Sequence, residues 1–238
     1  MEVRRALADN EELGESPLWP SLAIIASAGL YADLPSRFIG GAGGGAFGDL
    51  RWVVPVLTVL VLLALGVIRP SGRLARALNW GPRTAHVTRR RLVLLTIGIV
   101  SAANAASIGL LIHLLINGAR AHASPLLRAA VHMWLVNVLL FALWYWQLDG
   151  GGPLERPRCA PAQRDFLFPQ QTEPVLLEGG WRPLVLDYLY VSFTNASAFS
   201  PTDTMPLSRW AKMLMLLQSA ISLALAVMVV ARAVNILG

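Results

Sequence analysis

Two histidines lie inside long apolar stretches of this 238-residue chain, and histidine readily exchanges a proton or binds a metal near neutral pH. His113 and His132 are candidates for function because ionisable groups are costly inside membrane-length apolar stretches. Neither stretch carries an acidic residue that could complete a proton relay, and the two histidines do not have the spacing of a helical metal site. The favoured interpretation is a neutral histidine hydrogen-bonded to Asn104, Asn137 or a backbone carbonyl.

A second polar feature is the segment Pro183–Pro206, which reads PLVLDYLYVSFTNASAFSPTDTMP. Its uncharged part, Tyr188–Thr202, has 15 residues and is rich in Ser, Thr and Asn. An apolar helix needs about 20 residues to cross a bilayer. Irregular backbone at membrane depth is tolerated only where protein buries it or a water-filled cavity faces it. We therefore predict a re-entrant helix and loop inside a protein assembly.

No other residues form a pattern that indicates an enzyme, a cofactor or a metal site. Asp187 and Asp203 lie on either side of an apolar stretch, and Cys159 is the single cysteine, so no intrachain disulfide can form. The glycine-rich run Gly40–Gly45 lacks the Lys and Ser or Thr of a phosphate-binding loop, which favours a flexible connection. No nucleic-acid-binding motif accompanies the net charge of +6. We expect no catalytic residues, no metal, no cofactor and no nucleic-acid partner.

The elements that must position these residues are membrane helices. Hydrophobic residues make up 55% of the chain and charged residues 14%, with a mean hydropathy of +0.55, which excludes a soluble globular enzyme. Uniformly apolar runs indicate helices rather than the alternating strands of a β-barrel. The fold class is therefore an all-α integral membrane protein, a multi-pass helical bundle in the cell membrane. The five predicted spans are Leu18–Tyr31, Trp52–Ile68, Leu92–Asn117, Ala129–Trp146 and Trp210–Leu237.

The polar segment resembles the pore loop of tetrameric cation channels, whose potassium-selective members read roughly YFSxxTxTTVGYGDxxP. In YVSFTNASAFSPTDTMP the matching residues include Tyr190, Ser192, Asp203 and Pro206, with Ser197 in place of a Thr. The whole chain is also similar to multi-pass bacterial membrane proteins that carry Asp-Tyr-Leu-Tyr-x-x-Phe-Thr before a final helix, which implies no activity. The implied organisation is an N-terminal polar segment 1–17, three helices within 18–128 with a basic loop 69–91, and a channel-like module 129–238. That module would comprise an outer helix 129–146, a loop 149–182, a pore helix and loop 183–206, and a last helix 210–237.

This chain departs from potassium channels at the Gly-Tyr-Gly of the filter, where it has Ser200-Pro201-Thr202. A potassium filter aims backbone carbonyls at the ion, whereas Pro201 fixes φ and removes an N–H. We therefore expect a lining of side chains, with a ring of Asp203 that attracts cations. Under the resemblance, the pore or filter residues are Thr194, Asn195, Ser197, Ala198, Phe199, Ser200, Pro201, Thr202 and Asp203. On the last helix Gln218 and Ser222 share a face, which suits the lining of a water-filled path or close helix packing equally well.

The leading functional hypothesis is a homotetramer in the lipid bilayer that conducts monovalent cations with weak selectivity. A nonconducting scaffold or sensor that keeps the channel fold is the second hypothesis. A small six-helix transporter, in which Pro183–Phe199 crosses the membrane fully, is the third.

Two expectations about the side of the membrane from which the pore loop enters contradict each other. The positive-inside rule places the arginine-rich loop in the cytoplasm, and two helices later the loop 149–182 returns to that side. A pore loop of the usual channel polarity opens from outside. An inverted pore, an external arginine loop or a sixth span would each remove the conflict. The seven arginines of the basic loop are Arg69, Arg73, Arg76, Arg83, Arg89, Arg90 and Arg91.

Overall fold

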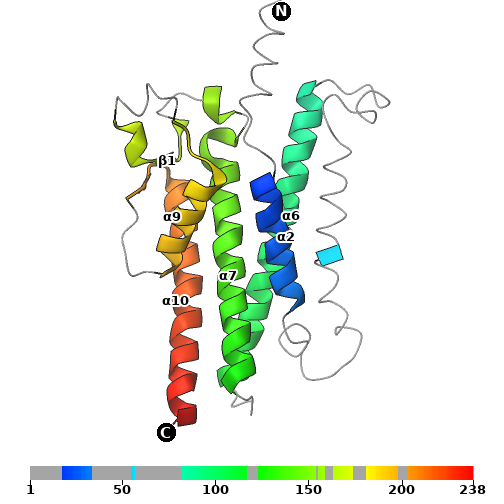
Figure 1. Ribbon diagram of the computed structural model, residues 1–238, viewed down its shortest axis with the longest axis vertical. Coiled ribbons are helices and arrows are strands. Elements are labelled where there is room, and N and C mark those ends of the chain that lie inside the picture. The colour runs from blue at the N-terminus through cyan, green and yellow to red at the C-terminus, as the bar shows by residue number, and fades with distance from the viewer. Residues whose placement is uncertain are drawn as a thin grey trace, which may run out of the picture.

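The computed structural model describes residues 18–33, 55–56, 82–116, 123–153, 155–158, 163–173, 181–197 and 203–237. These residues are mostly helical (Figure 1). The main helices are α2 (Leu18–Ala32), α6 (Pro82–Ile116), α7 (Ala123–Leu148), α9 (Val185–Ser197) and α10 (Arg209–Leu237). Three short 3-10 turns, at Asp149–Gly151, Arg156–Arg158 and Pro169–Gln171, and two short strands, β1 (Phe166–Leu167) and β2 (Met205–Pro206), complete the described elements.

Three helices are long and apolar enough to cross a membrane, which confirms the prediction of a membrane protein in its coarse form. The candidate spans are Val87–His113, Leu127–Gly151 and Arg209–Val227. Helix α2 is apolar but has only 15 residues, fewer than the roughly 20 that a perpendicular span needs. The predicted span Trp52–Ile68 lies outside the described residues except for residues 55–56. The structure therefore supports three of the five predicted spans by length and composition.

Helix α6 begins ten residues before the predicted start at Leu92, so the prediction that the basic loop extends to Arg91 is wrong. Pro82 is the first helical residue, a position where the missing proline N–H has no partner to lose. Arginine has a good intrinsic helix propensity, and its long side chain can reach the membrane surface from inside a helix. The arginines Arg89–Arg91 thus extend a membrane-length helix at one end.

Local signals also define where α7 and α10 begin and end. Helix α10 starts after Ser208, whose hydroxyl oxygen accepts the Ala211 N–H at 3.1 Å as a helix N-cap. Helix α7 ends at a glycine turn in which Gly150 has a φ of 56° and Gly152 a φ of 94°. A Cβ on Gly152 would lie 2.9 Å from the Gln147 carbonyl oxygen, so this turn needs glycine.

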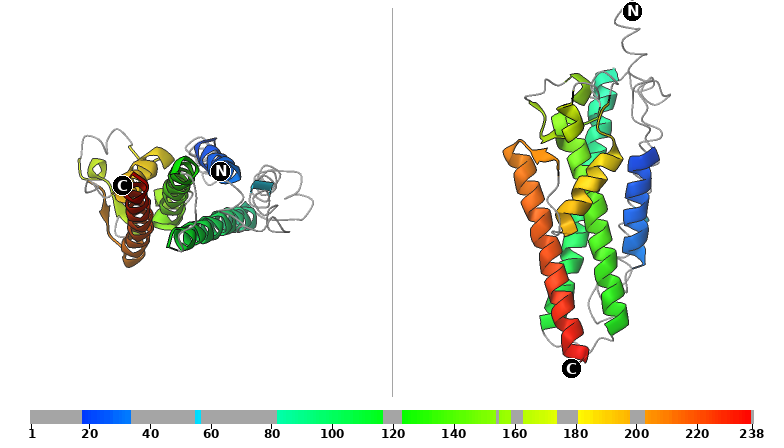
Figure 2. Two further views of the ribbon diagram at one scale, coloured as in Figure 1. Left: turned by 90° about the horizontal axis from the view of Figure 1, so that it is seen from below. Right: turned by 60° about the vertical axis from the view of Figure 1, so that its left-hand side comes forward.

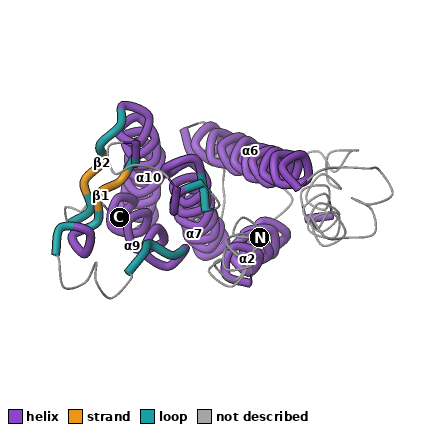
Figure 3. The backbone as a smooth tube through the Cα atoms, turned by 90° about the horizontal axis from the view of Figure 1, so that it is seen from above, coloured by secondary structure: helices purple, strands orange, loops and turns teal. Residues whose placement is uncertain are grey.

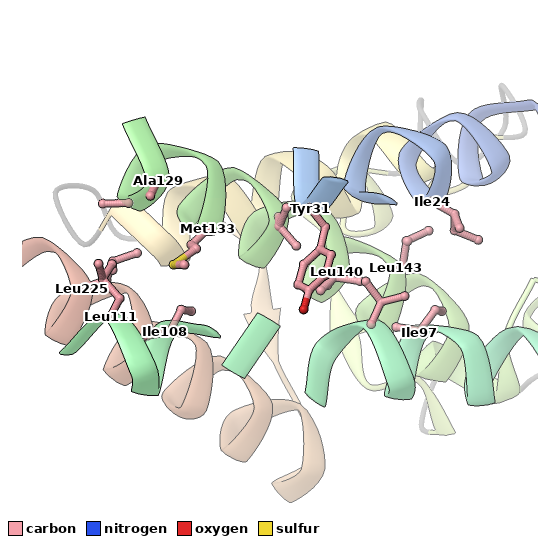
Figure 4. Close-up of a cluster of buried hydrophobic side chains, with 13 residues drawn as sticks. Ile24, Tyr31, Ile97, Ile108, Leu111, Ala129, Met133, Leu140, Leu143 and Leu225 are labelled. Atoms are coloured by element: carbon pink, nitrogen blue, oxygen red, sulfur yellow. The ribbon is translucent and has the colours of Figure 1, made fainter. Parts of the chain in front are cut away.

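Helix α7 lies between two groups of helices (Figure 3). Helices α2 and α6 pack on one side of α7, and α9 and α10 pack on the other, as the two turned views also show (Figure 2). On the first side, Ile24 and Tyr31 of α2 point toward Ile97 of α6 and Leu140 of α7 (Figure 4). On the second side the buried aromatic side chains are Phe141, Tyr145, Trp146, Phe166, Phe168 and Tyr188. Helix α7 is therefore the common core of both groups.

The two strands are an exception to the predicted all-α fold. Phe166 pairs with Pro206 and Leu167 with Met205 in an antiparallel ladder. The pair is two residues long on each side, too short for the hydrophobic alternation that predicts strands from a sequence. It joins the loop after α7 to the segment just before α10.

Candidate functional site

Both ends of the α9 segment are attached to the same part of the molecule. Before α9, the Arg156 guanidinium donates to the Pro183 carbonyl oxygen at 3.2 Å. After α9, the Leu207 N–H donates to the Asp165 carbonyl oxygen at 2.8 Å, next to the β1–β2 pair. The chain therefore runs down α9 from this end and is back at the same end by β2, as Figures 1 and 2 show.

A buried ion pair holds this end together. The Asp149 and Arg156 side chains are almost completely buried, with Arg156 Nε 3.4 Å from Asp149 Oδ2. Asp149 Oδ1 accepts the backbone N–H groups of Asp165 and Phe166, at 2.8 and 3.2 Å. The Tyr188 hydroxyl of α9 donates to Asp149 Oδ2, and the Arg156 guanidinium lies over the Tyr188 ring. Every charge is paired and hydrogen-bonded, which is the condition under which a buried ion pair is tolerated.

The start of α9 is also capped locally. Asp187 Oδ2 accepts the Leu184 N–H at 2.7 Å, in the third position of the helix where an acidic residue completes an N-cap. The carboxylate also lies near the positive end of the helix dipole. The predicted start of a short helix near Asp187 is therefore confirmed, with its first residue at Val185.

Gln218 is the centre of a polar network between α7, α9 and α10. Its side chain is completely buried. Its Nε2 donates to the carbonyl oxygen and to the hydroxyl oxygen of Ser192, at 2.9 and 2.7 Å. Its Oε1 accepts the Tyr145 hydroxyl at 2.6 Å and Asn195 Nδ2 at 2.8 Å. The Gln218 amide thus uses both of its protons and both of its lone pairs.

The two α9 residues of this network are satisfied as well. The Ser192 hydroxyl donates to the Val138 carbonyl oxygen of α7 at 2.7 Å. Asn195 Nδ2 donates a second hydrogen bond to the Met215 carbonyl oxygen at 2.9 Å, and its Oδ1 accepts the Ser219 hydroxyl at 3.1 Å. Within this network α9 is therefore bound to both neighbouring helices through polar groups.

The network lies well inside the helices that could cross the membrane. Leu139, next to Val138, is the thirteenth of the 25 residues in Leu127–Gly151. Gln218 is the tenth of the 29 residues of α10. Because α9 has 13 residues, it is about 20 Å long at 1.5 Å per residue. Its last turn therefore ends inside the bundle, close to the level of Gln218.

The predicted pore residues of α9 form hydrogen bonds within the chain. The Thr194 side chain is buried, and its hydroxyl donates to the Tyr190 carbonyl oxygen at 2.9 Å. The Ser197 hydroxyl donates to the Thr194 carbonyl oxygen at 3.0 Å. Asp203 is exposed near β2 and accepts the Thr204 hydroxyl at 3.5 Å. The predicted residues Ala198, Phe199, Ser200, Pro201 and Thr202 lie outside the described residues.

On α10, the structure corresponds to the packing alternative for Gln218 and Ser222. Ser222 is buried, and its hydroxyl oxygen accepts Asn137 Nδ2 of α7 at 3.0 Å. The exposed residues described between Met213 and Val230 are all apolar. The polar groups of α10 therefore face α7 and α9, and a lining role for Gln218 and Ser222 stays a prediction.

The other side of α7 contains polar groups with fewer partners. Asn104 of α6 is buried, and its Nδ2 donates to the Met133 carbonyl oxygen at 3.4 Å; its Oδ1 has no hydrogen-bond partner within the described part of the chain. His132 has the backbone partner that the sequence suggested, the Arg128 carbonyl oxygen at 2.7 Å. It also has a carboxylate partner that the sequence did not suggest, Asp33 at the end of α2, with 3.1 Å between Nε2 and Oδ2.

Several residues of the site were absent from the predicted set. Tyr145 and the pair Asp149–Arg156 were not singled out, and Ser192 was noted only for its register in the pore-loop resemblance. A signal for Asp149 exists, because it is the first charged residue after the uncharged run Ala129–Leu148. Among the described residues, no group of three or more His, Cys, Asp and Glu side chains could hold a metal ion.

Comparisons of the chain with models of protein families, with curated proteins and with solved structures found no match. The likeness of Tyr190–Pro206 to channel pore loops therefore stays a resemblance of motif. The functional proposal depends on the contacts of α7, α9 and α10.

Proposed function

We propose that this membrane protein forms a homotetrameric, channel-like assembly that passes monovalent cations with weak selectivity. In this proposal α9 is a re-entrant pore helix, and the segment 198–203 lines the path. The observation that supports it is the course of α9, whose two flanks are attached to one end of the molecule while its last turn reaches the level of Gln218. The same attachments give no support to a six-helix transporter in which Pro183–Phe199 crosses the membrane.

The depth of α9 makes an assembly necessary in this proposal. In this proposal the chain between Ser197 and Asp203 returns from inside the bundle, and backbone at membrane depth must be covered by protein or by water in a cavity. Tyr190 and Phe193 are about half exposed on the outer face of α9 in the single chain. Neighbouring copies would cover this apolar face and bring four segments 198–203 around one axis.

The expected selectivity follows from the chemistry of that segment. Four copies would place four Asp203 carboxylates around the axis, and a ring of acidic groups concentrates cations at a channel entrance. Pro201 and the missing glycines do not suit a stack of backbone carbonyl rings. Side-chain oxygens and water would then surround the ion, which gives weak discrimination between monovalent cations.

The distribution of basic residues gives the proposal an orientation. The basic residues described near the start of α6, the end of α7, and the starts of α9 and α10 outnumber those at the opposite end. By the positive-inside rule this end is cytoplasmic, so α9 would enter from the cytoplasm as an inverted pore loop. The basic residues at this end are Arg83, Arg89, Arg90, Arg91, Arg156, Arg158, Arg164, Arg182, Arg209 and Lys212.

Labelling of Cys159 tests this orientation. Cys159 falls between Arg158 and Gln163 in the sequence and is the single cysteine. A membrane-impermeant thiol reagent should leave it unlabelled in intact cells and label it after lysis. Labelling in intact cells would contradict the inverted orientation and give the ordinary channel polarity.

Conduction is tested with purified protein in planar bilayers. The wild type should give single-channel cation currents, and Asp203→Asn should reduce them several-fold because it removes the acidic ring. Glu173→Gln is the matched control, since Glu173 is an exposed acid outside the segment 183–206. Silence across voltage, pH and calcium would contradict conduction, and a monomer by mass measurement in detergent would contradict a shared pore.

A nonconducting scaffold is the second candidate, and the hydrogen bonds of α10 favour it. Gln218 and Ser222 are satisfied inside one chain, and the exposed residues of α10 described between Met213 and Val230 are apolar. This candidate predicts a stable tetramer without current in any condition. It also predicts that Asp203→Asn changes neither the assembly nor its stability.

A further inference from the structure

Two neighbouring arginines of α6 lie near the end of a helix that could cross the membrane. Arg90 and Arg91 are the fourth and fifth residues of the candidate span Val87–His113. At 1.5 Å per residue, Arg91 is about 6 Å inside the end of that span. Gln147 of α7, which Arg90 contacts, is the fifth residue from the end of the candidate span Leu127–Gly151. Both arginines are therefore close to the level of the lipid headgroups rather than at the centre of a bilayer.

Neither arginine has an acidic partner in the described part of the chain. The ion pairs described there involve Arg128, His132 and Arg156 instead. Arg90 Nη2 donates to the Gln147 carbonyl oxygen at 3.4 Å, while Arg90 Nε is buried and has no hydrogen-bond partner among the described residues. A guanidinium at the edge of an apolar layer is stabilised by an anion, so these two groups need one from outside the described residues.

Arg91 lies in a row of exposed apolar residues along α6. Val87 precedes it by four residues, Leu95 follows it by four and Ile99 by eight, so these side chains lie on one face of the helix. The exposed fractions are 44% for Val87, 61% for Leu95 and 44% for Ile99, and Arg91 is exposed as well. An apolar row with an arginine near its start matches a phospholipid, whose anionic headgroup is joined to apolar chains.

The direction of α6 favours contact between Arg91 and a headgroup. The Cα–Cβ bonds of a helix tilt toward its N-terminus, and Arg91 lies near the N-terminal end of α6. Arg91 can therefore extend its guanidinium toward the membrane surface while its aliphatic part stays in the apolar layer. The first turn of α6 contains no acidic residue that would repel a phosphate.

We propose that Arg90, Arg91 and the apolar row of α6 bind one anionic phospholipid. The two guanidinium groups hold the phosphate, because a guanidinium donates paired hydrogen bonds to phosphate oxygens. An acyl chain of the same lipid lies along Leu95 and Ile99. The site is independent of the proposed pore, because no residue of α9 or of the segment 198–203 takes part.

Native mass spectrometry of the protein released from lipid nanodiscs tests the proposal. The discs contain phosphatidylglycerol and phosphatidylcholine in equal amounts in both leaflets, so the result does not depend on the orientation of the chain. The wild type should retain phosphatidylglycerol in preference to phosphatidylcholine. Arg91→Gln should reduce this preference about fivefold, the effect of one basic residue at an anionic membrane surface. Arg91→Lys should reduce it less, because the charge stays while the paired hydrogen bonds are lost.

Arg128→Gln is the matched control. Arg128 is an exposed arginine and the second residue of the candidate span Leu127–Gly151, and its guanidinium lies 4.0 Å from the Asp33 carboxylate. Because this guanidinium already has an acidic neighbour, its loss should leave the preference unchanged. Arg90→Gln should lower the preference as Arg91→Gln does. The variants of the exposed Arg91 decide the proposal if loss of Arg90 also disturbs the packing of α6 on α7.

Three results would overturn the proposal. One is a wild type that shows no preference for phosphatidylglycerol. Another is an equal reduction in Arg91→Gln and Arg128→Gln, which would mean that the preference reflects total charge. The third is release of the retained lipid by an excess of soluble glycerol phosphate, which would assign the arginines to a free anion. Single-channel currents have no bearing on any of these results, so failure of the pore proposal and failure of this one remain distinguishable.

Discussion

The two sides of α7 treat buried polar groups in opposite ways. On the side of α9 and α10, the Gln218 amide uses its full hydrogen-bonding capacity, and Ser192 and Asn195 are equally well paired. On the side of α2 and α6, Asn104 Oδ1 has no hydrogen-bond partner among the described residues, and the Asp33 carboxylate that contacts His132 is more than half exposed. Both sides bury apolar side chains against the same helix.

The difference indicates which helices are fixed and which can move. Lipid tails are as apolar as leucine, so polar bonds and close packing, rather than removal of apolar surface from water, hold membrane helices together. A helix whose polar groups are all paired has one favourable position, because any shift leaves several groups unsatisfied. We infer that polar bonds hold α9 more firmly in one position than they hold α2.

The largest loss of stability should come from breaking the Asp149–Arg156 ion pair, which holds the start of α9. Asp149→Asn leaves the buried Arg156 guanidinium without its carboxylate partner and weakens the bond from Tyr188. Breaking a buried ion pair by removing one partner costs about 3 kcal/mol or more. Unfolding by sodium dodecyl sulfate, followed by circular dichroism, should show this loss of stability.

Asp165→Asn is the control for that measurement. The Asp165 carboxylate is partly exposed and accepts one backbone N–H, from Gly150 at 3.2 Å. Its substitution should cost less than about 1 kcal/mol. Equal losses for the two variants would mean that burial of the Asp149–Arg156 pair does not decide the stability of this end.

The next largest loss of stability is expected at Gln218, the centre of the polar network between α7, α9 and α10. Gln218→Leu removes the acceptor of Tyr145 and the donor to Ser192 while it leaves both groups buried. The loss should be about 2 kcal/mol in the same assay. Leu217→Met, on the exposed face one residue away, should be close to neutral. A neutral Gln218→Leu would contradict the view that α9 is fixed through polar bonds.

The helices on both sides of this comparison could largely be predicted from the sequence. The predicted helix 129–146 lies within α7, which begins at Ala123 and ends at Leu148, and the predicted 210–237 is α10 with one residue more at its start. Apolar runs fix such helices because lipid leaves the backbone no other partner. The start of α6 was missed because a run of arginines before an apolar segment also suits a loop.

The partners within the site could not be predicted in the same way. Asn195 and Gln218 were identified from their own segments, but Tyr145 and Ser192 meet them only after three helices pack. Asp33 lies far from His132 along the chain, and no periodicity connects them. A resemblance of motif also gave polar residues a lining role, whereas the packing direction of α10 decides whether they face a path or a neighbouring helix.

The smallest changes in stability are expected for two asparagines, Asn137 of α7 and Asn104 of α6. Asn137→Leu removes the 3.0 Å bond to the Ser222 hydroxyl oxygen and should cost about 0.6 kcal/mol, the average for polar bonds between membrane helices. Asn104→Leu removes a bond of 3.4 Å together with an oxygen that has no partner. Replacing an unsatisfied polar group by an apolar one of similar size is nearly neutral or stabilising.

The sign of the Asn104→Leu effect therefore tests the comparison itself. A change between zero and a gain of about 0.5 kcal/mol would agree with an α2–α6 side whose polar groups are less completely paired. A loss larger than that of Asn137→Leu would mean that Asn104 Oδ1 has a partner in the membrane, such as a bound water molecule. In that case both sides of α7 would be equally well paired, which would contradict the inference that α9 is held more firmly than α2.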